Sequence, residues 1–83
     1  MNVNNRSRKL TLKELREAVP GLSQVVAAVS INVSPATLSS WENGRSVPRL
    51  PLEDWYTLAK LYNVSLDELL EAIQLTEEES TKH

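Results

Sequence analysis

The side chains that could support catalysis or hold a metal are few and scattered along the chain. His83 is the single histidine among 83 residues, and there is no cysteine. A metal site built from Cys and His, or a nucleophile activated by a histidine and a carboxylate, has too few members here. The carboxylates fall on helical faces predicted to be exposed. We therefore expect no metal, no cofactor and no enzymatic activity.

Short polar side chains and cations are the more informative groups. Small polar residues concentrate between residues 34 and 45, where their hydroxyl and amide groups could contact nucleic acid. Residues 1–49 carry a net charge of +4, whereas residues 50–83 carry −6. Because exposed charges are screened over about 8–10 Å, a local basic face can attract phosphate while a distant acidic end is screened. The overall net charge of −2 therefore does not exclude nucleic acid as a partner.

Five helices must position these side chains. Apolar spacing and capping residues predict helices near residues 11–19, 23–31, 35–43, 52–62 and 65–75. Two of them begin with capping boxes, formed by Thr11 with Glu14 and by Ser65 with Glu68. We find no strand pattern and no internal repeat. The sequence predicts a flexible basic arm at 1–9, a single all-α domain at 10–75 and a disordered acidic tail at 76–83.

The second and third predicted helices are joined by the short segment Asn32-Val33-Ser34. Asparagine tolerates the left-handed conformation that ends a helix, and Ser34-Pro35 is a favourable helix start. A second helix rich in small polar residues, placed after such a turn, can enter the major groove of DNA. Helical bundles contain many similar turns, so spacing alone does not establish a DNA-binding role.

The residues around this turn resemble the Cro/phage-repressor helix-turn-helix family, also called the xenobiotic-response-element type. The matching positions are Leu22, Ser23, Gln24, Ala28, Ile31, Val33, Ser34, Leu38, Ser39, Trp41, Glu42 and Gly44. Further matches occur at residues 58–60 and 64–70, so the similarity covers roughly residues 10–73. The resemblance implies a compact five-helix, lambda-repressor-like DNA-binding domain.

The resemblance also implies roles for individual residues. Gln24 corresponds to a glutamine that holds a phosphate at a helix start, where free N–H groups favour anions. Arg16 and Glu42 correspond to a buried salt bridge between helices. Asn43 and Arg45 would lie near the DNA backbone. The base-reading set would be Pro35, Ala36, Thr37, Ser39 and Ser40, and Ser34 before them would also belong to the DNA-binding residues.

The reading face departs from the family pattern. Relatives often read bases with glutamine, arginine or asparagine, whose paired hydrogen bonds discriminate by roughly 1–3 kcal/mol. The residues here offer single hydroxyl bonds and apolar contacts. We expect modest direct readout, with more specificity from DNA shape, from water and from an N-terminal arm formed by Arg6, Arg8 and Lys9. These three cations could equally be an ordinary solvated chain end.

A second departure is an apolar strip on the second helix, formed by Val25, Val26 and Val29, where relatives usually have polar residues. Local repacking could bury one or two of these valines. Alternatively, the strip could be a contact surface for a second subunit or for a partner protein.

These features predict a sequence-specific transcriptional regulator, a repressor that binds an inverted-repeat operator in double-stranded DNA as a homodimer. The alternative is an antitoxin-like module that binds a partner protein, with or without DNA. The basic N-terminus lacks the apolar stretch of a secretory signal. The apolar-rich residues 25–33 are too short to span a bilayer. We therefore expect a cytoplasmic protein with no membrane partner.

Overall fold

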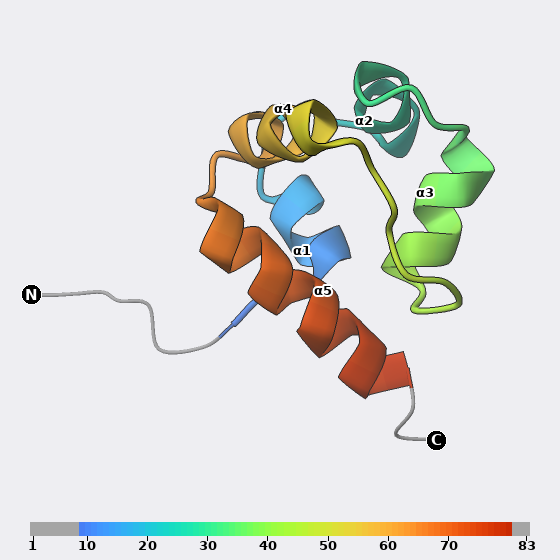
Figure 1. The fold of residues 1–83 in the computed structure, drawn as a ribbon, viewed down its shortest axis with the longest axis vertical. Helices are drawn as coiled ribbons and strands as arrows, with labels where there is room; N and C mark the ends of the chain where they lie inside the picture. The colour runs from blue at the N-terminus through green and yellow to red at the C-terminus, as the bar shows by residue number, and fades with distance from the viewer. Residues whose placement is uncertain (1–8, 81–83) are drawn as a thin grey trace, which may run out of the picture.

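The chain folds into five helices. A computed structural model describes residues 9–80, and within that range it contains helices but no strand (Figure 1). The helices are α1 (Leu12–Glu17), α2 (Gln24–Ser30), α3 (Pro35–Glu42), α4 (Leu52–Tyr62) and α5 (Leu66–Ser80). This arrangement confirms the predicted all-α fold class. None of the helices in this range is long and apolar enough to cross a membrane.

Side-chain caps fix where the helices begin. Thr11 and Glu14 form the expected capping box of α1, with the Thr11 backbone donating to Glu14 at 2.8 Å. Ser23 accepts a bond from the Val26 backbone, and Ser34 accepts one from Thr37. These oxygens satisfy backbone N–H groups that have no partner within their own helix. The local sequence therefore determines the starts of α1, α2 and α3.

The core is made chiefly of aliphatic side chains, joined by the aromatic rings of Trp41 and Tyr62, and every helical segment contributes to it. The five largest fully buried residues are Leu12, Ile31, Leu38, Leu58 and Leu69. Helix α2 packs against α3 and α4, while α1 packs against α3 and α5. Figure 1 shows α3 at the edge of the fold, beside α2 and the segment that leads to α4. One side of α3 is therefore anchored in the core while the other faces outward.

Two turns of the fold have the same backbone geometry. Asn32 after α2 and Asn63 after α4 both adopt left-handed conformations, with φ of 61° and 60°. In each turn the following valine N–H donates to an alanine carbonyl five residues earlier, at 3.0 Å. Each turn then ends in a serine that caps the next helix. The two turns share the tripeptide Asn-Val-Ser, at 32–34 and at 63–65.

The end of α5 departs from the predicted domain boundary. Residues 76–83 were expected to form a disordered acidic tail, yet α5 continues to Ser80. The extension is ordered because Thr76 continues the inward-facing row of Leu69, Ala72 and Ile73. Its hydroxyl accepts a bond from the Leu12 backbone at 2.9 Å. Residues 81–83, like residues 1–8 of the predicted arm, lie outside the described residues.

Candidate nucleic-acid interface

A buried ion pair attaches α3 to the rest of the domain. Arg16 on α1 donates from Nε to Glu42 Oε2 at 2.7 Å and from Nη2 to Glu42 Oε1 at 3.2 Å. Arg16 is 9% exposed and Glu42 is 7% exposed. A third bond runs from Arg16 Nη1 to the carbonyl of Leu22, just before α2. Removing either partner would leave a buried charge without compensation, so the pair constrains how α1 and α3 meet.

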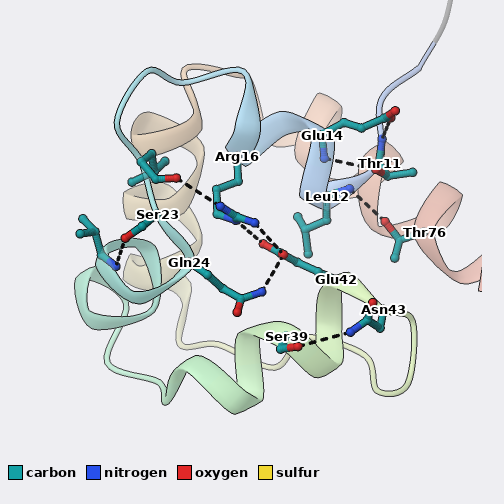
Figure 2. Close-up of polar contacts among 12 residues, drawn as sticks. Thr11, Leu12, Glu14, Arg16, Ser23, Gln24, Ser39, Glu42, Asn43 and Thr76 are labelled. Carbon is teal, nitrogen blue, oxygen red and sulfur yellow. Dashed lines mark hydrogen bonds and ion pairs between the residues drawn. The ribbon is translucent and has the colours of Figure 1, made fainter.

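Gln24 adds α2 to this network. Its Nε2 donates to Glu42 Oε1 at 2.9 Å, so Glu42 accepts bonds from α1 and from α2 together (Figure 2). The hydrogen bond with Glu42 raises the pKa of Arg16 above its ordinary value. Gln24 itself is only partly buried. The residue expected to hold a phosphate therefore also links α2 to α3.

The network leaves the outer face of α3 without charge. Glu42 is the single charged residue among the eight of α3, and it points inward. Six predicted DNA-binding residues lie here: Ser34, Pro35 and Ala36 are exposed, and Thr37, Ser39 and Ser40 are partly exposed. The structure places all six on α3 or its cap. No carboxylate of α3 would oppose phosphate at this face.

Local hydrogen bonds pre-order two pairs of side chains on this face. Ser34 Oγ donates to Thr37 Oγ1 at 2.9 Å, and Asn43 Nδ2 donates to Ser39 Oγ at 3.3 Å (Figure 2 shows the second pair). The single hydroxyl proton of Ser34 is used in its bond, whereas the Asn43 amide keeps a second N–H. The hydroxyls of Thr37 and Ser39 each keep their O–H donor and one acceptor lone pair for further bonds. The face therefore offers a few fixed hydrogen-bonding groups beside the methyl and methylene surfaces of Pro35 and Ala36.

Cations flank the C-terminal end of α3. Arg45 and Arg49 are exposed in the segment that leads from α3 to α4. Lys13 is exposed on α1, and Lys9 is exposed just before it. The remaining predicted arm residues, Arg6 and Arg8, lie outside the described residues. The described cations nearest in sequence to α3 thus follow its end rather than its start.

The acidic end of α5 lies beside these groups and not at a distance from them. Ser80 Oγ lies 3.4 Å from the Gly44 carbonyl. A groove of about 260 Å³ at this junction is lined by Lys13, Asn43 and Glu79, among others. The expectation that the acidic end would be remote from the basic face was therefore wrong. Because α5 folds back across α1, sequence separation of the charges does not become spatial separation.

The three valines of α2 are exposed in the isolated chain. Val25, Val26 and Val29 have 55%, 50% and 67% of their surface accessible. The inward side of α2 is filled by Ala27 and Ala28 instead. Local repacking therefore buries none of the valines. The strip that they form stands on a helix with no charged residue.

Sequence reasoning missed the contacts of Thr76 and Ser80. Both residues were assigned to a disordered tail, yet Thr76 is 4% exposed and Ser80 packs on Gly44. The sequence did contain a signal for these contacts, because residues 69, 72, 73, 76 and 80 have the spacing of one helical face. The acidic run at 77–79 obscured it. Within residues 9–80, no three His, Cys, Asp or Glu side chains gather as a metal would require.

Comparison with known proteins gives one match. A family model described as a helix-turn-helix domain matches residues 10–72. Neither the curated proteins nor the solved structures include a significant match. The matched region contains α1 to α4, the first half of α5 and the whole Arg16–Glu42–Gln24 network. The chain therefore belongs to the helix-turn-helix domain family, as its resemblance to the Cro/phage-repressor type implies.

Proposed function

We propose that this protein is a sequence-specific DNA-binding transcriptional regulator whose α3 enters the major groove. The observation that carries the proposal is the two-sided character of α3. Its single charge is buried against Arg16 and Gln24, while its outer face is small, polar and free of carboxylates. A helix held in this way can approach base edges closely without repelling the phosphates beside them.

Direct readout would come from hydroxyl and apolar groups. Thr37, Ser39 and Ser40 would each make single hydrogen bonds to base edges, and Pro35 and Ala36 would contact thymine methyl groups. Ser34 would lie at the entry of the helix into the groove. Such contacts discriminate less than the paired bonds of arginine or glutamine, so DNA shape supplies the remaining specificity.

Phosphate contacts would position the domain. Gln24, Asn43 and Arg45 would touch the DNA backbone on either side of the groove, with Arg6, Arg8 and Lys9 adding contacts from the arm. As a homodimer, the protein would bind an inverted repeat whose half-sites are roughly 34–36 Å apart. Occupying such an operator in the cytoplasm would block a promoter, which makes the regulator a repressor.

Selection of bound sequences from random duplex DNA tests this function. An inverted repeat should be recovered, because two α3 helices related by a two-fold axis read the same half-site. Affinity for the recovered site should fall as salt rises, with a slope near −0.9 for each phosphate contacted. Absence of DNA binding at low salt would contradict the proposal, and recovery of a single unrepeated half-site would contradict the dimer.

A matched pair of variants tests the phosphate contacts. Arg45→Ala should weaken binding to all sequences equally and reduce the salt slope by about 1. Lys60→Ala removes the same charge from an exposed position on α4 and should change neither quantity. Equal effects of the two variants would show that Arg45 contributes only general charge.

The exposed valine strip favours protein binding as a second candidate function. Three apolar side chains that are at least half exposed on an uncharged helix suit a protein partner better than a phosphate backbone. Capture of a partner from the native host should be lost in Val26→Glu and Val29→Glu. Val47→Glu places the same charge on an equally exposed valine outside α2 and should leave capture intact. Retention of the partner by all three variants would show that the valine strip does not bind it.

A further inference from the structure

The last two turns of α5 reach beyond the matched helix-turn-helix region and contact two other elements. The family match ends at residue 72, whereas α5 ends at Ser80. Thr76 is buried at the start of α1, where its hydroxyl accepts from the Leu12 backbone at 2.9 Å. The same hydroxyl donates to the Ala72 carbonyl at 2.8 Å, so both of its functions are satisfied. Figure 2 shows this side chain pointing from α5 toward α1.

One turn later, α5 packs against Gly44, the residue after the C-cap of α3. A Cβ atom at Gly44 would lie 2.5 Å from both Cβ and Oγ of Ser80, and 3.1 Å from the Thr76 carbonyl oxygen. The Ser80 hydroxyl has one proton and lies nearer the Glu77 carbonyl, at 3.0 Å, than the Gly44 carbonyl, at 3.4 Å. Its contact with Gly44 is therefore chiefly steric. Only the absence of a side chain at residue 44 allows the two segments to come this close.

Gly44 lies between the two residues expected to contact the DNA backbone at the end of α3. Asn43 precedes it and Arg45 follows it. The Gly44 and Arg45 N–H groups donate to Trp41 and Ser40 at 3.2 and 2.9 Å, which closes the C-terminal end of α3. A displacement of Gly44 would therefore move both flanking side chains and loosen the last turn of the helix.

We propose that residues 73–80 of α5 position the C-terminal end of α3 for DNA binding, with Thr76 and Ser80 as positioning residues. Thr76 anchors the extension to α1, and Ser80 sets the position of Gly44. The inference rests on the proposed DNA-binding function and adds a control element to that site. Binding groups must be held to within about 0.5 Å to be effective, so a rigid support behind Asn43 and Arg45 raises affinity without touching DNA.

A second glycine provides a matched control for this contact. Gly21 has φ +76° and Gly44 has φ +72°, so alanine meets the same backbone strain at both positions. No atom lies within 4 Å of a Cβ placed at Gly21. Any additional effect of Gly44→Ala over Gly21→Ala therefore measures the contact with α5.

The experiment compares DNA affinity and its salt slope for the full-length chain and its variants, at a temperature where each is fully folded. Gly44→Ala should bind roughly tenfold more weakly than wild type and lose about one unit of salt slope. The DNA affinity of Gly21→Ala should stay within about twofold of the wild-type affinity. Adding Ser80→Gly to Gly44→Ala removes the two closest atoms and should recover most of the loss. Equal affinities for the two alanine variants would overturn the proposal.

Thr76 supplies a test that does not strain the backbone. Thr76→Val keeps the shape but leaves the Leu12 N–H unpaired, which releases α5 from α1. It should weaken DNA binding severalfold and speed hydrogen exchange at the Gly44 and Arg45 amides. Thr76→Ser restores the hydroxyl and should rescue both readouts. Stability loss in Thr76→Val with unchanged affinity and unchanged exchange at residues 44 and 45 would overturn the positioning role.

DNA affinity and hydrogen exchange together show whether the positioning role fails alone or together with the proposed function. If wild type binds DNA but Gly44→Ala behaves as Gly21→Ala does, the positioning role fails while the proposed function stands. If wild type binds no DNA at low salt, the proposed function fails and the positioning role for DNA falls with it. In that case, exchange at Gly44 and Arg45 still reports whether α5 controls the end of α3.

Discussion

The turn between α2 and α3 and the turn between α4 and α5 are built from the same three residues, Asn-Val-Ser. Their left-handed asparagines differ by 1° in φ, and in both turns the valine N–H donates to an alanine carbonyl at 3.0 Å. The helices that follow differ in charge. Positions 36, 37 and 40 of α3 hold Ala, Thr and Ser, whereas the corresponding positions 67, 68 and 71 of α5 hold Asp, Glu and Glu. The turn geometry is thus shared, whereas α3 lacks the carboxylates that α5 carries at these positions.

The buried sides of the two units also differ. Glu42 is buried at the end of α3, while the corresponding residue on α5 is Ile73, which packs in the core. An apolar side chain can therefore occupy the helical position that corresponds to Glu42. The charged pair at Arg16 and Glu42 fixes the orientation of α3 through directional bonds that the α5 unit does not need.

The largest effect is expected from breaking that pair. Arg16→Ala should lower the free energy of unfolding by about 3–5 kcal/mol, because Glu42 would remain buried without its cation. Chemical denaturation measures the change. Arg16→Met combined with Glu42→Ile imitates the apolar α5 unit and should recover most of the stability. If the single variant costs under about 1 kcal/mol, a value typical of exposed pairs, the bridge does not act as a buried one.

The next effect comes from giving α3 the charge of α5. Ser40→Glu should weaken DNA binding by roughly tenfold to a hundredfold, because the new carboxylate would face phosphates. Fluorescence anisotropy with the selected operator measures the affinity. The reciprocal variant Glu71→Ser changes the corresponding position of α5. It should change DNA affinity by less than about twofold. Similar losses in both variants would show that α3 is not the reading helix.

Much of this organisation could be predicted from the sequence. Capping residues and apolar spacing located the helices, because both signals are local. The resemblance pointed to Arg16 with Glu42, a pair separated by 26 residues that spacing alone would not connect. The placement of α5 against Gly44 could not be derived in this way. It depends on the path of α5 across α1, and the acidic run at 77–79 suggested a solvated tail.

A smaller effect tests whether the two turns are energetically equivalent. Asn32→Ala and Asn63→Ala should each cost about 1 kcal/mol, because alanine tolerates the left-handed conformation less well than asparagine. Thermal unfolding of the two variants compares them directly. Glycine at either position relieves the strain and should restore stability to near that of wild type. Costs that differ by more than about 0.5 kcal/mol would show that tertiary packing, and not the shared turn, dominates one of them.

The smallest effect concerns the residue before each asparagine, which is Ile31 in one turn and Tyr62 in the other. The Tyr62 hydroxyl is buried without a hydrogen-bond partner among the described residues. Tyr62→Phe makes the second turn apolar like the first, and it should leave stability unchanged or raise it by up to about 1 kcal/mol.

The pH dependence of Tyr62→Phe gives a second readout. Burial raises the pKa of Tyr62 above its usual value of 10.0. The neutral phenol is therefore favoured in the folded state. Its contribution is fully present below pH 10 and declines as pH rises beyond that value, because the unfolded chain ionises first. Denaturation at pH 8 and pH 11 should show a smaller decline in stability for Tyr62→Phe than for wild type. An equal decline would mean that Tyr62 ionises as readily in the folded protein as in the unfolded chain, and that its burial is not maintained in solution.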